Sequence, residues 1–225
     1  MRTPPVSAPD PTRSPARSAA PWYPVNLVID GASVLVVGAG PVAARKVQGL
    51  LESGARVTVV APQAVSVVRN DARVRWHSRE YRRGEVASYA LAIAATGVRE
   101  VDAQVSADAR ASHIPVNVAD VPELCSFTLP SVLRSGELQV AVSTGGRSPA
   151  FAAWVRRRLE SVVDDTLGKA LAVAAEVRDE LHAAGMSTEI PGWHEAFDAG
   201  FLDLVAIGDR EAAKALLLDR LGVAQ

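Results

Sequence analysis

The chain has 225 residues, 48% of them hydrophobic, which is enough for one large domain or two small ones with a buried core. Its 24 basic and 25 acidic residues give a formal net charge of −1, so charge gives no reason to expect nucleic acid or an anionic membrane surface as the main partner. No apolar run approaches the roughly 18 residues of a membrane-spanning helix. Cys125 is the single cysteine, which excludes an intrachain disulfide and is typical of a cytoplasmic protein.

Residues 1–21 are rich in proline and poor in large apolar side chains. Such a segment cannot bury enough surface to offset the entropy of ordering, so we expect a disordered tail. It also lacks the apolar core of a signal peptide. Residues 23–31 are expected to form a short edge strand and a turn, with the rings of Trp22 and Tyr23 as packing anchors.

The segment 34–60 has the pattern of a strand, a tight turn, a helix and a second strand. Its first four residues are apolar, which predicts a strand buried on both faces of a parallel sheet. The turn fits the G-x-G-x-x-G/A fingerprint: the first glycine permits the turn, the second lets a pyrophosphate approach the backbone, and the third position allows close helix packing. The fingerprint residues are Gly38, Ala39, Gly40, Pro41, Val42 and Ala43.

The helix after this turn is amphipathic, with apolar side chains at i, i+4, i+7 and i+8 from Ala43 and with Lys46 on the polar face. Its N-terminus directs free N–H groups at the turn, which predicts an anion site for a phosphate-bearing ligand. The alternative is a turn whose glycines serve packing only. An acid usually holds the ribose 2′-OH about 20 residues further on, but Thr58 and two valines stand there, so the motif does not choose between NAD and NADP.

Three more segments, 74–77, 89–95 and 114–118, predict strands of the same sheet, and 100–112 predicts a helix. Ligands bind beyond the carboxyl ends of strands in open α/β sheets, so Thr96 and Gly97 should lie beside the cofactor. The strand 114–118 brings Asn117, Val118 and Asp120 to the same edge, where Asn117 and Val118 are expected to contact the cofactor. A carboxylate there is placed for proton transfer, while the alternative role of Asp120 is to cap or orient a loop.

Beyond residue 126 the pattern changes. Residues 127–133 and 138–142 predict two strands joined by a glycine-containing turn, a ribbon that is marginal alone and suits dimerisation. From Pro149 onward the chain is expected to be helical, with helices over 149–162, 166–184 and 209–221. The histidines and Cys125 lack metal-ligand spacing, so no metal site is predicted.

The loop between the ribbon and the helices is the second candidate site. Ser148 and Pro149 predict a helix start, which places backbone donors, hydroxyls and a guanidinium at a helix N-terminus. Such groups suit carboxylates or phosphates. The alternative is a glycine linker between domains. The candidate residues are Ser143, Thr144, Gly145, Gly146 and Arg147.

Four motifs in order resemble the precorrin-2 dehydrogenase and sirohydrochlorin ferrochelatase family, the N-terminal module of sirohaem synthases. They are GAGPVAARKVQGLLESGARVTVVAP, LAIAAT, IPVNVADVPELCSFTLPS and LQVAVSTGGRSPAFA, and the resemblance covers about residues 22–165. It implies a Rossmann-type α/β domain over 22–122, a small β dimerisation region over 123–148 and a helical domain over 149–225.

The resemblance also implies an activity. It implies NAD-dependent oxidation of precorrin-2 to sirohydrochlorin in a homodimer, and it leaves open insertion of Fe²⁺ into sirohydrochlorin by the same chain. The aspartate of the family's N-V-x-D motif corresponds to Asp120, which carries its catalytic role here, and Thr144 stands where relatives have serine. The positions that match the family's cofactor contacts are Pro41, Val42, Pro62 and Gln63. A regulatory module that binds NAD without chemistry is the alternative function.

Overall fold

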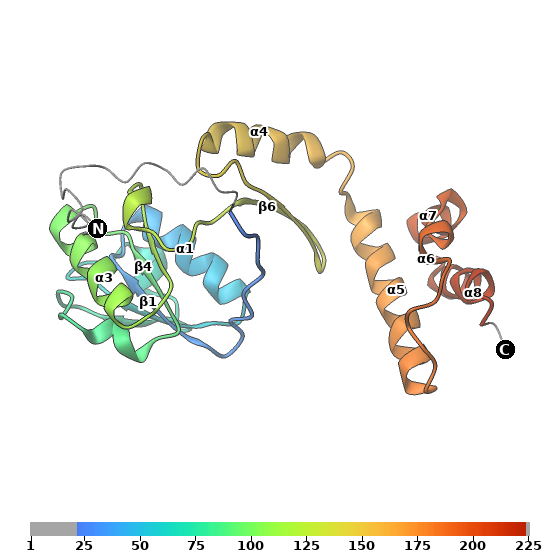
Figure 1. Cartoon of the computed structure of the whole chain (residues 1–225), viewed down its shortest axis with the longest axis horizontal. Helices are drawn as coiled ribbons and strands as arrows, with labels where there is room; N and C mark the ends of the chain where they lie inside the picture. The colour runs from blue at the N-terminus through green and yellow to red at the C-terminus, as the bar shows by residue number, and fades with distance from the viewer. Residues whose placement is uncertain (1–21, 224–225) are drawn as a thin grey trace, which may run out of the picture. The chain divides into compact units, whose positions relative to one another are not determined.

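The computed structural model describes residues 22–223, so the predicted tail 1–21 lies outside the described residues. The chain divides into two compact units, one ending at Leu129 and the other beginning at Pro130 (Figure 1). Among the described residues, no helix combines the length and the apolar character needed to cross a membrane.

The first unit is built on a five-stranded parallel sheet with the order β3-β2-β1-β4-β5. The order reverses between β1 and β4, which is the topological switch point of a Rossmann-type sheet. The predicted α/β class is therefore confirmed. The strands are β1 (Ser33–Val37), β2 (Arg56–Val60), β3 (Arg75–His77), β4 (Leu91–Ala94) and β5 (Val116–Val118).

Two helices cover the two faces of this sheet, α1 (Pro41–Glu52) and α3 (Arg99–Ala111) (Figure 1). Val36 packs in one core cluster with Val47 of α1, whereas Val37 packs in a second cluster with Val105 of α3. Successive strand residues thus point to opposite faces of the sheet. Both faces are buried, which explains why the strand sequences are apolar without interruption. The short elements of this unit are α2 (Ser66–Arg69) and the 3₁₀ helices η1 (Glu85–Ser88) and η2 (Pro122–Leu124).

The expected edge strand before β1 is wrong. Residues 22–29 have no regular structure, and the chain enters β1 through a turn at Asp30 and Gly31. A strand preceding this turn cannot pair with β1, because β2 and β4 occupy both of its edges. The aromatic anchors are wrong as well, since Trp22 is 45% and Tyr23 88% exposed.

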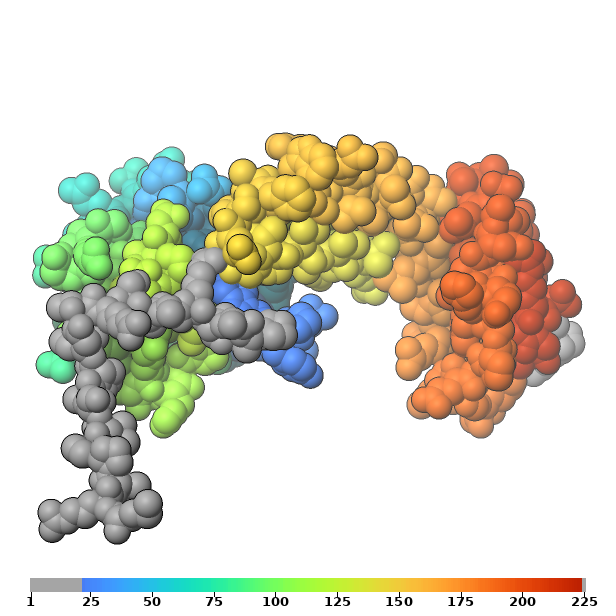
Figure 2. All heavy atoms as spheres, turned by 45° about the horizontal axis from the view of Figure 1, so that its top comes forward, coloured from blue at the N-terminus to red at the C-terminus, as the bar shows by residue number. Residues whose placement is uncertain are grey.

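The second unit begins with the antiparallel ribbon of β6 (Ser131–Ser135) and β7 (Leu138–Val142). The strand predicted over 127–133 starts later, because Ser126 N donates to Val116 O and thereby binds this part of the chain along β5. Helix α4 (Pro149–Leu159) contacts both strands of the ribbon and lies over it (Figure 2).

The remaining helices form a core of their own, visible as the orange and red cluster in Figure 2. Val177 of α5, Phe201 of α7 and Leu217 of α8 are fully buried at its centre. Helix α5 starts at a cap in which Asp164 Oδ1 accepts from Leu167 N at 3.2 Å. The bounds are α5 (Asp165–Ala183), α6 (Trp193–Ala196), α7 (Ala199–Ala206) and α8 (Arg210–Arg220).

Candidate functional site

Two glycines of the fingerprint have different physical roles. Gly38 has φ 101°, and a Cβ placed on it would lie 2.3 Å from the carbonyl oxygen of Ala95. The close approach of β4 therefore demands glycine at this position. Gly40 has an ordinary φ of −79°, and no atom lies within 4 Å of the place where its Cβ would be. Nothing within the first unit demands glycine there, so Gly40 keeps space open rather than relieving a contact.

The open space at Gly40 lies at the N-terminus of α1. Gly40 is the N-cap and carries no capping side chain, and Pro41 follows as the first helical residue. The first turn contains no acidic side chain, so its N–H groups and the helix dipole present positive potential. Ala43 is fully buried and lets the helix lie close to the sheet. These features fit the pyrophosphate of a dinucleotide.

The end of β2 lies beside this turn, where the ribose of a dinucleotide is usually held. Val60 and Ala61 are buried and apolar, and Pro62 and Gln63 follow as exposed residues. The Pro62 carbonyl accepts a hydrogen bond from Ser78 Oγ at 3.0 Å. No carboxylate stands at these positions, so none is present here to repel a 2′-phosphate.

The loop after β4 is held by a buried carboxylate. Asp102 is 4% exposed, and its Oδ1 accepts from Thr96 Oγ1 at 2.8 Å and from Thr96 N at 3.2 Å. Thr96 Oγ1 in turn accepts from Val98 N at 3.0 Å, and Gly97 has φ 74°. The sequence analysis did not identify Asp102. Its position in the first turn of the helix that follows the cofactor loop could have indicated that it holds this loop.

The end of β5 carries Asn117, Val118 and Asp120. Val118 is buried, and Asn117 is a buried polar residue at 6% exposure. Asp120 lies on the exposed loop with φ 61°, a backbone conformation that residues other than glycine seldom adopt. Strain of this kind is retained where the surroundings enforce it, and it clusters at functional sites.

Lys46 departs from the sequence expectation. Instead of lying on a solvated face, its Nζ donates to Asn117 Oδ1 at 3.0 Å. Burial lowers the pKa of Lys46 below its usual range, and the Asp120 carboxylate opposes this shift. The loops that follow β1, β4 and β5 start at the same edge of the parallel sheet. Lys46 of α1 reaches Asn117 of β5, three residues before Asp120.

The loop predicted to bind carboxylates belongs to the second unit. Thr144 Oγ1 accepts from Ser148 N at 3.1 Å and lies 3.2 Å from Ser148 O, and Ser143 Oγ accepts from Gly145 N at 3.3 Å. These hydroxyls therefore hold the turn itself. Arg147 is exposed, and Gly145 and Gly146 have φ of 59° and 68°. Binding of carboxylates by this loop stays a prediction.

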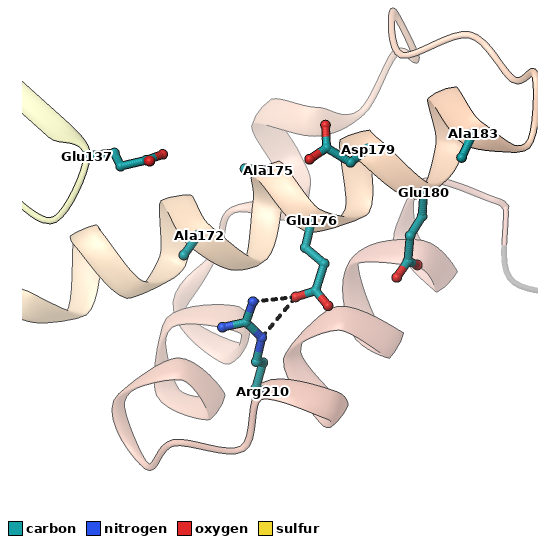
Figure 3. A pocket seen from close by; sticks show the side chains of 8 residues that line it. All are labelled: Glu137, Ala172, Ala175, Glu176, Asp179, Glu180, Ala183 and Arg210. Atoms are coloured by element: carbon teal, nitrogen blue, oxygen red, sulfur yellow. Dashed lines mark hydrogen bonds and ion pairs between the residues drawn. The ribbon is translucent and has the colours of Figure 1, made fainter. Parts of the chain in front are cut away.

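A separate surface pocket lies on α5 in the second unit (Figure 3). Four carboxylates line it, and Glu176 is paired with Arg210 through contacts of 2.9 and 2.6 Å. The excess negative charge disfavours an anionic ligand here. In residues 22–223, no three histidine, cysteine, aspartate or glutamate side chains are grouped as metal ligands. The acidic lining residues are Glu137, Glu176, Asp179 and Glu180.

The strand order and the glycine turn define the class of the first unit, a Rossmann-type dinucleotide-binding fold. Comparison with family models agrees with this class. Residues 25–131 match the family described as "Putative NAD(P)-binding", and residues 135–161 match "Sirohaem biosynthesis protein central". The chain is therefore similar, over two consecutive segments, to proteins of sirohaem biosynthesis.

Individual siroheme synthases are similar to most of this chain. The siroheme synthase of Nitrosomonas europaea is 38% identical over 206 residues, which are 89% of this chain and 43% of that protein. The siroheme synthase of Methylobacillus flagellatus is 36% identical over 197 residues, 85% of this chain and 42% of the relative. The chain thus spans less than half the length of these curated relatives.

A solved structure shares the fold. "SirC, precorrin-2 dehydrogenase" superposes with a TM-score of 0.69 at 24% identity, covering 89% of this chain and 99% of that one. The architecture of a Rossmann-type domain, a small β region and a helical C-terminal part is therefore that of a known protein.

Proposed function

We propose that this protein is a precorrin-2 dehydrogenase that uses NAD to form sirohydrochlorin. One observation carries the proposal: an open helix N-terminus at Gly40 and the exposed Asp120 loop follow strands that end at the same edge of the sheet. The names of the relatives and of the fold neighbour support the choice of substrate. No acid follows β2 to distinguish NAD from NADP, so the choice of NAD is based on the family resemblance.

The reaction removes a hydride and a proton from precorrin-2. When bound, NAD supplies the hydride acceptor. The first-turn amides of α1 would hold its phosphates, and the backbone of Thr96 and Gly97 would lie along it. Asp120 would accept the proton, because it is the exposed carboxylate on the loop that ends β5.

The positive charge of the loop 143–147 supports a substrate that carries carboxylates. Precorrin-2 carries several carboxylates, and the loop 143–147 offers an exposed guanidinium on Arg147 beside a helix N-terminus. We assign this loop, rather than the acidic pocket of α5, to the substrate. Thr144 and Ser143 support it indirectly by holding its turn.

Insertion of Fe²⁺ into sirohydrochlorin is a second candidate activity, with the metal as substrate. It requires loss of pyrrole N–H protons, which the same exposed carboxylate of Asp120 could accept. Anaerobic assays with sirohydrochlorin and Fe²⁺ or Co²⁺ test it, and loss of both activities in Asp120→Ala would show that one carboxylate serves both.

The decisive experiment mixes the protein, NAD and precorrin-2 anaerobically and follows NADH absorbance. We expect Asp120→Asn to lower kcat by about 10²–10⁴-fold while NAD still binds. Glu123→Gln, which removes an exposed carboxylate three residues away, is the matched control and should keep full activity. Binding of NAD without any NADH formed by the wild type would favour the regulatory module instead.

We also propose that the protein is a cytoplasmic homodimer. Exposed apolar side chains support an interface: Val28 is 93% exposed, and Phe151 and Trp154 of α4 are 55% and 46% exposed. The rings of Phe151 and Trp154 lie 5.4 Å apart and form a contiguous aromatic patch.

A further inference from the structure

A polar network lies beneath the loop that carries Asp120. It starts at Lys46, whose Nζ donates to Asn117 Oδ1 across 71 residues of sequence. The other end of the Asn117 amide, Nδ2, donates to Phe127 O at 3.1 Å and lies 3.6 Å from Cys125 Sγ. The network thereby connects α1, β5 and the chain that follows η2.

The thiol of Cys125 binds the backbone on both sides of Asp120. Sγ accepts from Val118 N at 3.1 Å, and it lies 3.3 Å from Val118 O and 3.5 Å from Val121 O. Its single proton can serve one of these carbonyls at a time. Burial raises the pKa of Cys125, so the thiol keeps this proton at neutral pH.

The stretch of backbone that the thiol contacts contains Asp120. Asp120 has a positive φ, and such a conformation persists where the surrounding structure enforces it. The thiol contacts before and after Asp120 hold this turn together with the backbone hydrogen bond from Val121 N to Val118 O. Asn117 connects the thiol to Lys46, and a half-buried ammonium is retained only when polar or charged partners compensate its lost hydration.

We propose that Lys46, Asn117 and Cys125 form a network that positions the Asp120 carboxylate for its reaction. Lys46 is a positioning residue, because Asn117 stands between it and the loop backbone. This inference rests on the proposed function, since it assigns Lys46 to the same proton transfer. A shift of about 1 Å in a reacting group can cost 10²-fold in rate, so the network has a measurable effect.

The test compares Lys46→Met, Asn117→Leu and the double variant with the full-length protein. Lys46→Met should lower kcat by about 10- to 100-fold while the Kd for NAD stays unchanged, and Lys46→Arg should recover part of the loss. The double variant should lose no more than the stronger single one, because the two side chains act as one unit. Additive losses, or equal loss of NAD binding and kcat, would overturn the proposal.

A second readout does not depend on catalysis. Cys125 is the only cysteine in the chain, so the rate of its reaction with a thiol reagent reports on the loop alone. Loss of the Lys46 charge by itself raises the pKa of Cys125 and leaves less reactive thiolate, so the rates are compared per thiolate. On that basis Lys46→Met should accelerate the reaction, whereas Gln48→Met, on the exposed side of the same helix, should not. If Lys46→Met fails to fold, Lys46→Gln takes its place in both measurements.

The two readouts separate the two proposals. A wild-type protein that forms no NADH from precorrin-2 contradicts the proposed function, while the thiol rates still test the network. An unchanged rate per thiolate in Lys46→Met contradicts the network, whatever the activity of the wild type.

Discussion

Gly38 and Gly40, two positions apart, show how the same amino acid can either allow close packing or leave space open. A Cβ on Gly38 would meet the backbone of Ala95 and Thr96, at 2.3 and 2.9 Å. A Cβ on Gly40 would meet nothing. One glycine thus allows β4 to approach the turn, and the other leaves room in front of the α1 amides.

This difference gives a matched pair of variants. Gly38→Ala should destabilise the fold by more than about 2 kcal/mol, because a positive φ and a backbone clash combine. Gly40→Ala should change the free energy of unfolding by less than about 1 kcal/mol yet weaken NAD binding at least about tenfold, since its methyl group fills the phosphate space. Urea unfolding and NAD titration measure both. NAD binding of Gly40→Ala at wild-type strength would contradict the assigned site.

At the scale of elements, Asp108 joins α3 to the segment around η1. It accepts from Gly84 N at 2.7 Å, from Tyr81 Oη at 2.9 Å and from Gln104 Nε2 at 2.7 Å. Burial alone would raise the pKa of Asp108, but these hydrogen bonds outweigh it and lower the pKa. Burial and the Asp108 carboxylate also raise the pKa of Tyr81, so the phenol stays protonated and keeps donating.

The lowered pKa of Asp108 makes stability depend on pH in a defined direction. The ionised carboxylate favours the folded state above the unfolded pKa of about 4, and this contribution is lost as pH falls through the lower folded pKa. Asp108→Asn should therefore be less stable than the wild type at pH 7, by about 1–3 kcal/mol, and the gap should shrink below about pH 4. Urea midpoints at several pH values measure this. Glu100→Gln, on an exposed site of α3, is the control, and a gap that stays constant to low pH would contradict the role of Asp108.

At the scale of the whole molecule, the proposed homodimer predicts the molecular mass of the protein in solution. Light scattering should give about 47 kDa, twice the 23.7 kDa of one chain. Replacing Phe151 and Trp154 together by serine should shift the protein toward the monomer, because an aromatic patch at an interface contributes strongly to association. Ile207→Ser, which removes an isolated apolar side chain that is 76% exposed, should not. A wild-type monomer would contradict the dimer.

The pattern of apolar residues was enough to predict most elements. Strands such as Val34–Val37 and helices such as 100–112 are recognisable because burial repeats with the period of the backbone. The glycine turn was recognisable because its residues are neighbours in sequence. The expected strand over 23–31 does not form, and pairing with β1 is excluded because strands from later in the chain occupy both edges of β1.

The sequence by itself therefore determined the Rossmann-type class, the glycine turn and the loop that carries Asp120. The tertiary structure alone decided that Gly38 serves packing and Gly40 space, that Asp102 holds Thr96, and that Lys46 reaches Asn117. The physical reason is that local conformation and burial follow from nearby residues, whereas the partner of a polar side chain depends on where the sheet places distant strands.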